Sequence, residues 1–364
     1  MFSAYRRLLT WLSAMAIGTA CLGDVVTAQP RDRPVLHMSA EYLGSLFFLD
    51  TRTGWAVGNR GVILATRNGG LTWEPQKSGV DEDLHGVSFA DTGVGWAVGD
   101  RGTIVATHDG GETWQRQVSS TNEDLFGVYT LNRSRGRVGW VVGAGGTILR
   151  TTNGGETWQG QHSGGTLKDL SSVDFVDELT GWAVGSFGVI VTTGDGGRSW
   201  EIQRSATDQS LSGVSFGNSK AGWAVGDEGL ILVTRDAGRS WEQQVSRVNA
   251  SLWSVYFLNA IAGWAVGGSG TILATSDGGN TWVKQPSPTK AALLGVYFSD
   301  DRTGWAVGAD REIWATRDGG ATWQAFGGVS QDGASQTGGL FGSQRRPALL
   351  SAFLAPGWVF CTCG

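Results

Sequence analysis

The segment LHGVSFADTGVGWAVGDRGTIVATHDGGETW, residues 84–114, decides the fold. It places Trp96, within Gly-Trp-Ala-Val-Gly, 18 residues before Trp114. Seven such pairs occur along the chain, and the first Trp of successive pairs is 41, 44, 42, 41, 41 and 41 residues apart. A fixed period of about 40–50 residues is typical of β-propellers, so seven pairs predict seven blades. The pairs are Trp55/Trp73, Trp96/Trp114, Trp140/Trp158, Trp182/Trp200, Trp223/Trp241, Trp264/Trp282 and Trp305/Trp323.

Each repeat is expected to form four short strands. The two residues Asp100-Arg101 are flanked by glycines, which is the spacing of a tight hairpin turn. A second turn contains Gly110 and Gly111, which permit positive φ. The predicted fold is an all-β, seven-bladed β-propeller of four-stranded antiparallel blades, spanning residues 43–326. In the second repeat the expected strands are Leu84–Phe89, Gly95–Gly99, Thr103–Thr107 and a fourth that begins at Thr113-Trp114.

The repeated Trp pair is predicted to form the core between blades. A four-stranded meander buries too little surface alone, whereas radial stacking buries both faces of each sheet. Each indole buries about 150–250 Å² in such a core. The alternative is a platform on which sugars stack.

Both ends of the chain lie outside the repeats. Residues 1–28 are predicted to be a signal peptide, and residues 29–42 an N-terminal segment that contributes to ring closure if Val35–His37 adds a strand. Residues 327–364 form a tail that is first rich in Gly, Ser and Gln and then apolar. Cys361 and Cys363 lie in this tail, so the fold does not depend on disulfides.

The N-terminus predicts export. Arg6 and Arg7 precede an apolar run at 8–22, and Val26-Thr27-Ala28 offers a cleavage site. The expected location is the periplasm or the thylakoid lumen, in association with a membrane. Cys21 leaves a lipoprotein anchor as the minor alternative.

Composition and charge limit the function. The formal net charge is −5, which disfavours a nucleic-acid partner held by phosphate neutralisation. The four histidines show neither metal-ligand spacing nor a common place in the repeat. No metal site, cofactor or catalytic residue is therefore predicted.

The turn before the second Trp of each pair carries a motif. The pattern T-x-[DN]-x-G-x-[ST]-W recurs in all seven repeats, for example at Thr107–Trp114. It resembles the Asp-box, or BNR repeat, of sialidases and other propellers. Combined with Gly-Trp-Ala-Val-Gly, it resembles the Ycf48/Hcf136 family of photosystem II stability and assembly factors. This resemblance implies a non-enzymatic propeller, peripheral to the membrane on its exported side, that assists a membrane protein complex such as the photosystem II core.

A carbohydrate-active Asp-box enzyme, sialidase-like, is the alternative function. Such an enzyme needs several converging arginines, a Tyr–Glu pair and an acidic Asp. Tyr129, Tyr256 and Tyr297 share one place in the repeat with Ser88 and Ser215, and we interpret them as packing variation. The sequence thus favours a scaffold.

The variable end of the propeller is the expected partner surface. Turns between the second and third strands lie at the same end as the links between blades, and these segments vary while the Asp-box turns do not. Arg60 and Arg101, on adjacent blades, and Phe187 are the candidate partner-binding residues, with Phe187 as an apolar anchor. The alternative surface is the insertion in the third repeat, which carries Arg133, Arg135 and Arg137.

Overall fold

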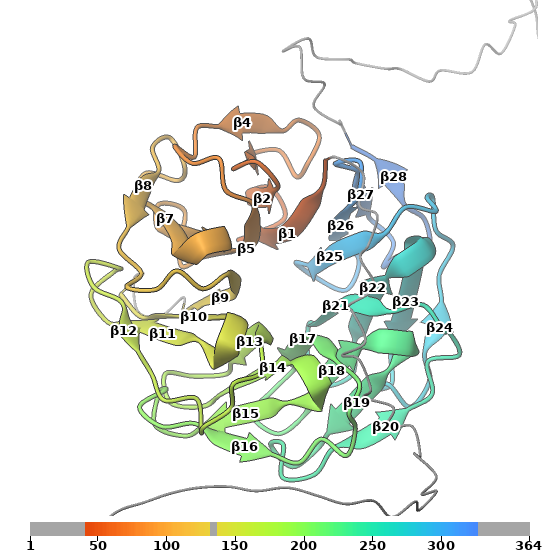
Figure 1. Ribbon diagram of the computed structural model, residues 1–364. Coiled ribbons are helices and arrows are strands. Elements are labelled where there is room, and N and C mark those ends of the chain that lie inside the picture. Colours follow the sequence, from red (N-terminus) through yellow and green to blue (C-terminus); the bar gives the residue numbers. More distant parts are fainter. Residues whose placement is uncertain (1–40, 132–136, 327–364) are drawn as a thin grey trace, which may run out of the picture. The chain divides into compact units, whose positions relative to one another are not determined.

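The computed structural model describes residues 41–131 and 137–326. These residues form seven four-stranded sheets, each with its strands in sequence order, arranged around a central axis (Figure 1). The predicted seven-bladed β-propeller is confirmed. The first strands surround the axis and are β1 (Leu43–Phe48), β5 (Leu84–Phe89), β9 (Leu125–Thr130), β13 (Leu170–Phe175), β17 (Leu211–Phe216), β21 (Leu252–Phe257) and β25 (Leu293–Phe298).

The remaining strands follow outward in each blade, and all pairings are antiparallel. The second strands are β2 (Gly54–Gly58), β6 (Gly95–Gly99), β10 (Gly139–Gly143), β14 (Gly181–Gly185), β18 (Gly222–Gly226), β22 (Gly263–Gly267) and β26 (Gly304–Gly308). The third strands are β3 (Ile63–Thr66), β7 (Thr103–Thr107), β11 (Ile148–Thr151), β15 (Ile190–Thr193), β19 (Ile231–Thr234), β23 (Thr271–Thr275) and β27 (Ile313–Thr316). The outermost strands are β4 (Glu74–Gln76), β8 (Gln115–Gln117), β12 (Gln159–Gly160), β16 (Glu201–Gln203), β20 (Glu242–Gln244), β24 (Val283–Lys284) and β28 (Gln324–Ala325).

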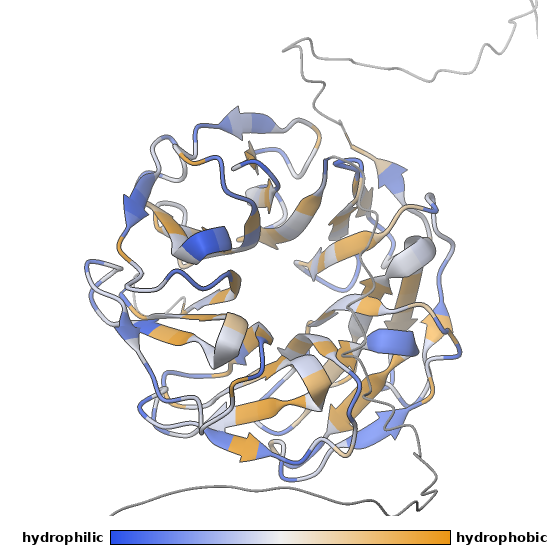
Figure 2. Cartoon of the chain, in the orientation of Figure 1, coloured by the Kyte–Doolittle hydropathy of each residue, from blue (hydrophilic) through white to orange (hydrophobic). Residues whose placement is uncertain are grey.

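Hydropathy follows this radial order. The second strands are buried along their whole length, because they lie between neighbouring blades. The outermost strands β4, β8 and β20 face solvent and are hydrophilic, as Figure 2 shows. The core therefore lies between the sheets, around their second and third strands.

The turn between the second and third strands has three residues, one more than the expected two-residue loop, because Gly102 belongs to the turn between the paired Gly99 and Thr103. In five blades it is a 3₁₀ turn: η1 (Asp100–Gly102), η3 (Ala144–Gly146), η4 (Ser186–Gly188), η5 (Asp227–Gly229) and η6 (Gly268–Gly270). Its middle residue is left-handed, with φ of 52° at Arg101, and Gly102 follows with φ of 68°. A Cβ on Gly102 would lie 2.0 Å from the carbonyl oxygen of Thr121, so only glycine fits.

Aromatic stacking joins six of the seven blade pairs. The second-strand Trp of one blade lies parallel to a first-strand Phe of the next, as Trp182 does on Phe216 with ring centroids 3.6 Å apart. All fourteen repeat Trp side chains are buried, which confirms the predicted core and argues against a platform for sugars. The six stacks are Trp55/Phe89, Trp140/Phe175, Trp182/Phe216, Trp223/Phe257, Trp264/Phe298 and Trp305/Phe48.

The second Trp of each pair lies just outside the fourth strand, which corrects the expected strand start at Thr113-Trp114. In every blade the strand begins at the next residue, because the Asp-box turn extends as far as the Trp and holds its backbone out of the ladder. The second Trp residues are Trp73, Trp114, Trp158, Trp200, Trp241, Trp282 and Trp323. The indole still points into the core and is at most 8% exposed.

The side chains of these second Trp residues cover the core on its outer side. Six meet the first-strand Phe of their own blade edge-on, and the contacts are Trp73/Phe48, Trp114/Phe89, Trp200/Phe175, Trp241/Phe216, Trp282/Phe257 and Trp323/Phe298. Their indole N–H groups differ. Trp282 Nε1 donates to Gln244 Oε1 at 3.0 Å, as the equivalent atoms of three other blades do to a Gln. Trp73 Nε1, Trp200 Nε1 and Trp323 Nε1 have no hydrogen-bond partner among the described residues, so these three rings contribute through packing alone.

The junction between the second and third blades lacks the Trp–Phe stack found at the other six junctions. Thr130 occupies the place of the Phe, and its hydroxyl is 2.8 Å from that of Ser88. Gln117 provides other contacts at this junction, because its Oε1 accepts hydrogen bonds from both Trp96 Nε1 and Trp158 Nε1. A polar bridge therefore replaces the aromatic stack at this junction.

Asp-box turns hold the outer rim of each blade. In the second blade Asp109 accepts hydrogen bonds from the hydroxyl and backbone N–H of Thr113 and from the hydroxyl of Thr107. These bonds, led by the one from the Thr113 hydroxyl, lower the pKa of Asp109 to about 2. Trp55 Nε1 of the preceding blade donates to Gly110 O in the same turn, so the box also links blades.

Within the described part of the chain, the ring closes without a strand exchanged across the seam. Blade seven consists of β25–β28 and blade one of β1–β4, so blades are in phase with the repeat. Trp305 stacks on Phe48 and donates from Nε1 to Gly69 O at 2.9 Å, repeating the contact seen at other junctions. Tyr42 pairs with Ala309 as an isolated antiparallel bridge. Val35–His37 and the signal segment lie outside the described residues.

Candidate functional site

The turns that carry Arg60, Arg101 and Phe187 lie at the end of the propeller that also holds the links between blades. We call this the link end, and the opposite end the Asp-box end. The backbone N–H of Arg60 and of Arg101 each donates at 2.9 Å to the Asp that precedes the next blade, Asp83 and Asp124 respectively. These bonds fix the turns, so the two guanidinium groups start from rigid positions on adjacent blades.

Arg60 borders a groove of about 490 Å³. The groove runs between the third and fourth strands of blade one and the link that follows, with Pro75, Lys77 and Val80 among its walls. Arg311 of blade seven also lines the groove and forms an ion pair with Glu41 at 3.4 Å. A groove with an apolar floor and cationic rim can accept an extended polar segment.

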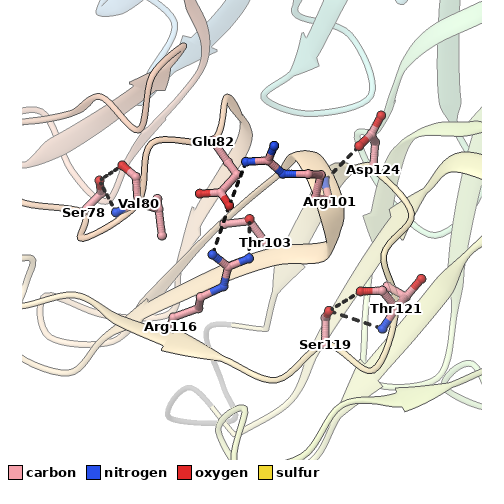
Figure 3. A network of polar contacts seen from close by, with 9 residues as sticks. All are labelled: Ser78, Val80, Glu82, Arg101, Thr103, Arg116, Ser119, Thr121 and Asp124. Carbon is pink, nitrogen blue, oxygen red and sulfur yellow. Dashed lines mark hydrogen bonds and ion pairs between the residues drawn. The ribbon is translucent and has the colours of Figure 1, made fainter.

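Arg101 belongs to a network of polar contacts (Figure 3). Its Nη2 lies 3.1 Å from Glu82 Oε1, which Arg116 Nη1 also contacts at 3.1 Å. Bonds from its own backbone N–H, Arg116 and Arg101 lower the pKa of Glu82 to about 2. The Arg101 side chain is nevertheless 73% exposed, and an exposed ion pair of this kind contributes about 0–1 kcal/mol. An incoming anion can therefore compete for Arg101 while Arg116 keeps its contact with Glu82.

Phe187 projects from blade four and is 62% exposed. Lys168 Nζ lies 4.1 Å from the centre of its ring. Both residues line a groove of about 640 Å³ that includes Ile202 and Arg204. The structure thus keeps the three candidate residues at one end but does not gather them into one pocket, because Phe187 lies two blades from Arg101.

The alternative arginine-rich surface is described only in part. Arg133 and Arg135 lie outside the described residues. Arg137 is exposed, and its carbonyl oxygen accepts a hydrogen bond from Gly154 N in the Asp-box turn of blade three. The insertion therefore begins and ends at the Asp-box end.

The central axis holds two cavities that the sequence did not reveal. One, of about 170 Å³, lies toward the link end and is lined by glycines and by serines such as Ser171 and Ser212. The other, of about 580 Å³, lies toward the Asp-box end and is lined by Phe47, Tyr129 and Asp174, among others. Apolar side chains form a waist between them: Leu46, Val87, Val128, Val173, Val255 and Val296 line both cavities.

Two carboxyl groups line the larger cavity, Asp174 and Asp177. Burial raises the pKa of Asp174 to about 7, whereas backbone N–H groups of Leu179 and Thr180 oppose burial and lower the pKa of Asp177. Asp177 caps a hairpin turn, as Asn218 does in the next blade. Because Asn serves equally well there, Asp177 is a structural residue, and the described lining of the cavity offers no second carboxylate free for hydrolysis.

Other common sites are absent from the described part of the chain. It contains no group of three His, Cys, Asp or Glu side chains that could hold a metal ion. No helix among residues 41–131 and 137–326 has the length and apolar character needed to span a membrane.

Comparison with solved structures supports the architecture. YCF48 from Cyanidioschyzon merolae aligns with a TM-score of 0.64 and 24% identity over 76% of this chain and 96% of that chain. A structure of YCF48 bound to D1 peptide aligns with a TM-score of 0.64 and 22% identity over 76% and 93% of the two chains. An ancestral GH74 enzyme reaches a TM-score of 0.65 at 12% identity, over 82% of this chain and 49% of the enzyme. At these identities the similarity concerns the fold.

The seven sheets and the Asp-box turns define this protein as a repeat β-propeller. Its link-end turns are held in place by hydrogen bonds to the next blade. The model of the family described as photosynthesis system II assembly factor YCF48 matches residues 77–167 and 161–251. Residues 77–251 therefore resemble the repeats of this family, in agreement with the resemblance noted from the sequence. No curated protein matches the sequence significantly.

Proposed function

We propose that this protein is a non-enzymatic scaffold that assists the assembly or stability of a membrane protein complex from the exported side of the membrane. The match of its repeats to the photosystem II assembly factor family carries this proposal. A segment of a photosystem II core subunit is the first candidate partner, because a protein of the same fold is described as bound to D1 peptide.

The link end supplies the surface for that partner. Arg60 and Arg101 present two guanidinium groups from fixed turns on adjacent blades, next to a groove with an apolar floor. Guanidinium groups bind carboxylates in a bidentate manner, so an extended segment with acidic or polar side chains is the matching ligand. Phe187 adds an apolar contact for a partner large enough to reach blade four.

Export is part of the same proposal. The N-terminal basic residues and apolar run support secretion to the periplasm or thylakoid lumen, with the propeller peripheral to the membrane. Cleavage after Ala28 is expected in preference to lipid attachment at Cys21. Mass determination of the N-terminus of protein purified from native membranes distinguishes the two.

Partner capture tests the function. The full chain, tagged and purified from solubilised membranes of its own organism, is expected to retain a subunit of a photosystem or of another membrane complex. Arg60→Glu combined with Arg101→Glu is expected to reduce retention by about tenfold or more, since each guanidinium contact to an anion contributes about 1.5–3 kcal/mol. The unfolding midpoint is expected to stay unchanged, because both side chains are exposed.

Two further variants make this test decisive. Arg198→Glu with Arg239→Glu reverses two exposed charges at the Asp-box end and serves as the matched control. Loss of retention only on changing Arg133, Arg135 and Arg137 would assign binding to the other face. Recovery of a membrane complex unrelated to photosynthesis would support the scaffold function but reject a photosystem subunit as the partner.

No hydrolytic activity is expected from this protein. Purified chain is to be assayed with sialosides and common β-glycosides, and turnover should not exceed that of the buffer. The physical reason is that the described lining of the larger central cavity holds two carboxyl groups and one of them, Asp177, is engaged in capping a turn, whereas a glycosidase needs two that are free to react. Turnover that disappears in the Asp174→Asn variant would show that the propeller is an enzyme.

A further inference from the structure

One place in the repeat points its side chains into the larger central cavity. In the seven blades it is occupied by Phe47, Ser88, Tyr129, Asp174, Ser215, Tyr256 and Tyr297. All seven line the cavity, although they come from segments far apart in the sequence. The ring geometry thus brings four aromatic rings and one carboxyl group around a single space.

Three of the four aromatic rings form a continuous wall. Tyr256 and Tyr297 lie 4.6 Å apart between ring centroids, and Phe47 lies 5.5 Å from Tyr297. Tyr129 stands on the other side, next to the blade that carries Asp174. Burial raises the pKa of all three tyrosines, so their rings remain neutral.

The structural role of Asp174 needs a hydrogen-bond acceptor but not a charge. Its Oδ2 accepts a hydrogen bond from Phe216 N of the next blade at 2.7 Å. Ser88 and Ser215 accept the equivalent bond from Thr130 N and Phe257 N through their hydroxyl groups. Since serine suffices to link the blades, the carboxylate at this place adds a charge that the fold does not need.

That charge has no cationic partner in the cavity. The described residues that line it include no Lys, Arg or His, and the only other ionisable groups are the three tyrosines and Asp177. A carboxylate desolvated without a counter-ion is costly. A ligand that brings a positive charge would relieve this cost.

We propose that the larger central cavity binds a small organic cation with an alkylated ammonium group. The ammonium would pair with Asp174 and contact the faces of Tyr129, Tyr256 and Tyr297 through cation–π interactions. A cavity of about 580 Å³ has the size of small-molecule sites. Its mouth lies between the strand hairpins at the Asp-box end, so this site is separate from the partner surface proposed at the link end.

Calorimetric titration of the purified full chain with choline tests the site. Saturable binding is expected, and the neutral isostere 3,3-dimethylbutan-1-ol is expected to bind at least about tenfold more weakly, which corresponds to about 1.4 kcal/mol. Absence of saturable binding, or equal binding of the isostere, would overturn the proposal. Arg60→Glu with Arg101→Glu should leave choline binding unchanged, so this test is independent of partner capture.

Asp174→Ser is the informative variant. It keeps an acceptor for Phe216 N, as Ser88 and Ser215 do in their blades, but removes the charge. We expect unchanged folding and loss of choline binding by about tenfold or more. If this variant does not fold, Tyr129→Leu and Tyr129→Phe replace it: Leu should weaken binding, and Phe, which keeps the ring face, should not. Wild-type affinity in Asp174→Ser, or in Tyr129→Leu, contradicts the proposal.

The pH dependence follows from the groups that face the ligand. Asp174, with its pKa raised to about 7, loses its charge as the pH falls, while Asp177 stays ionised and the tyrosines stay neutral. Choline binding should therefore weaken from about pH 8 to about pH 5 in the wild type. The residual binding of Asp174→Ser should not change over that range.

A free amine and a lysine side chain present the same chemistry. n-Butylammonium and Nα-acetyl-lysine N-methylamide distinguish the two sources. Tighter binding of the lysine derivative would assign the site to a side chain of a bound polypeptide, and tighter binding of butylammonium would assign it to a free amine. Failure of both cations and of choline to bind would contradict the proposal.

Discussion

Replacing Trp182 by Ala is expected to destabilise the propeller by about 3–5 kcal/mol, the usual cost of removing a fully buried large aromatic side chain. The indole is 0% exposed, stacks on Phe216 at 3.6 Å and donates from Nε1 to Ala237 O. Its removal leaves a cavity between two blades and an unpaired carbonyl oxygen. Urea unfolding followed by tryptophan fluorescence measures the loss.

Phe187→Ala is the matched control, because this aromatic ring is exposed and its loss should change stability by less than about 0.5 kcal/mol. A double-mutant cycle with Phe216→Ala should give a coupling energy of about 0.5–1.5 kcal/mol. An unchanged unfolding midpoint in Trp182→Ala would refute the assignment of the Trp pairs to the core.

The second large effect is expected at the seam of the ring. Trp305→Ala removes the stack on Phe48 and the bond to Gly69 O, at the one junction that no peptide link connects. We expect a loss of about 3–5 kcal/mol, as at other junctions. In addition, amide protons of β1 and β25 should exchange faster, because the seam can open without unfolding the other blades.

Hydrogen exchange on Trp182→Ala provides the comparison for this variant. There the two blades remain joined by the chain, so protection should fall less at their first strands than at β1 and β25 in Trp305→Ala. Equal patterns in the two variants would mean that the seam opens no more easily than the linked junctions. Arg311→Met, which removes the ion pair with Glu41 but leaves the Trp305 stack, is expected to reduce stability less than Trp305→Ala.

Much of the fold could be predicted from the spacing of Trp96, Trp114 and their equivalents, because a fixed period counts the blades and the turn residues delimit the strands. The aromatic partner was harder to find. Phe89 recurs in six repeats, but only the ring places it against the Trp of the preceding blade. Ring closure depends on contacts between the two ends of the repeat array, and local patterns do not contain that information.

The residues of the candidate sites also differ in whether the sequence alone could reveal them. Arg60 and Arg101 could be found as variable residues in equivalent turns, and the structure places both at the link end. Asp174 was missed, because Ser, Tyr and Asp at one place in the repeat look like tolerated variation in separate blades. Only the ring brings Tyr256 of blade six and Asp174 of blade four to the same cavity.

Because each blade coincides with one sequence repeat, the fold does not require the blades to begin with the present first repeat. Among residues 41–131 and 137–326, no blade takes a strand from the other end of the chain, so each junction rests on contacts between complete blades. The propeller could therefore start at any link between blades if a flexible linker joined residues 41 and 326, which bound the seven repeats. Circular permutants of this propeller should fold, and an eighth blade could arise by duplication of one repeat without redesign of a shared sheet.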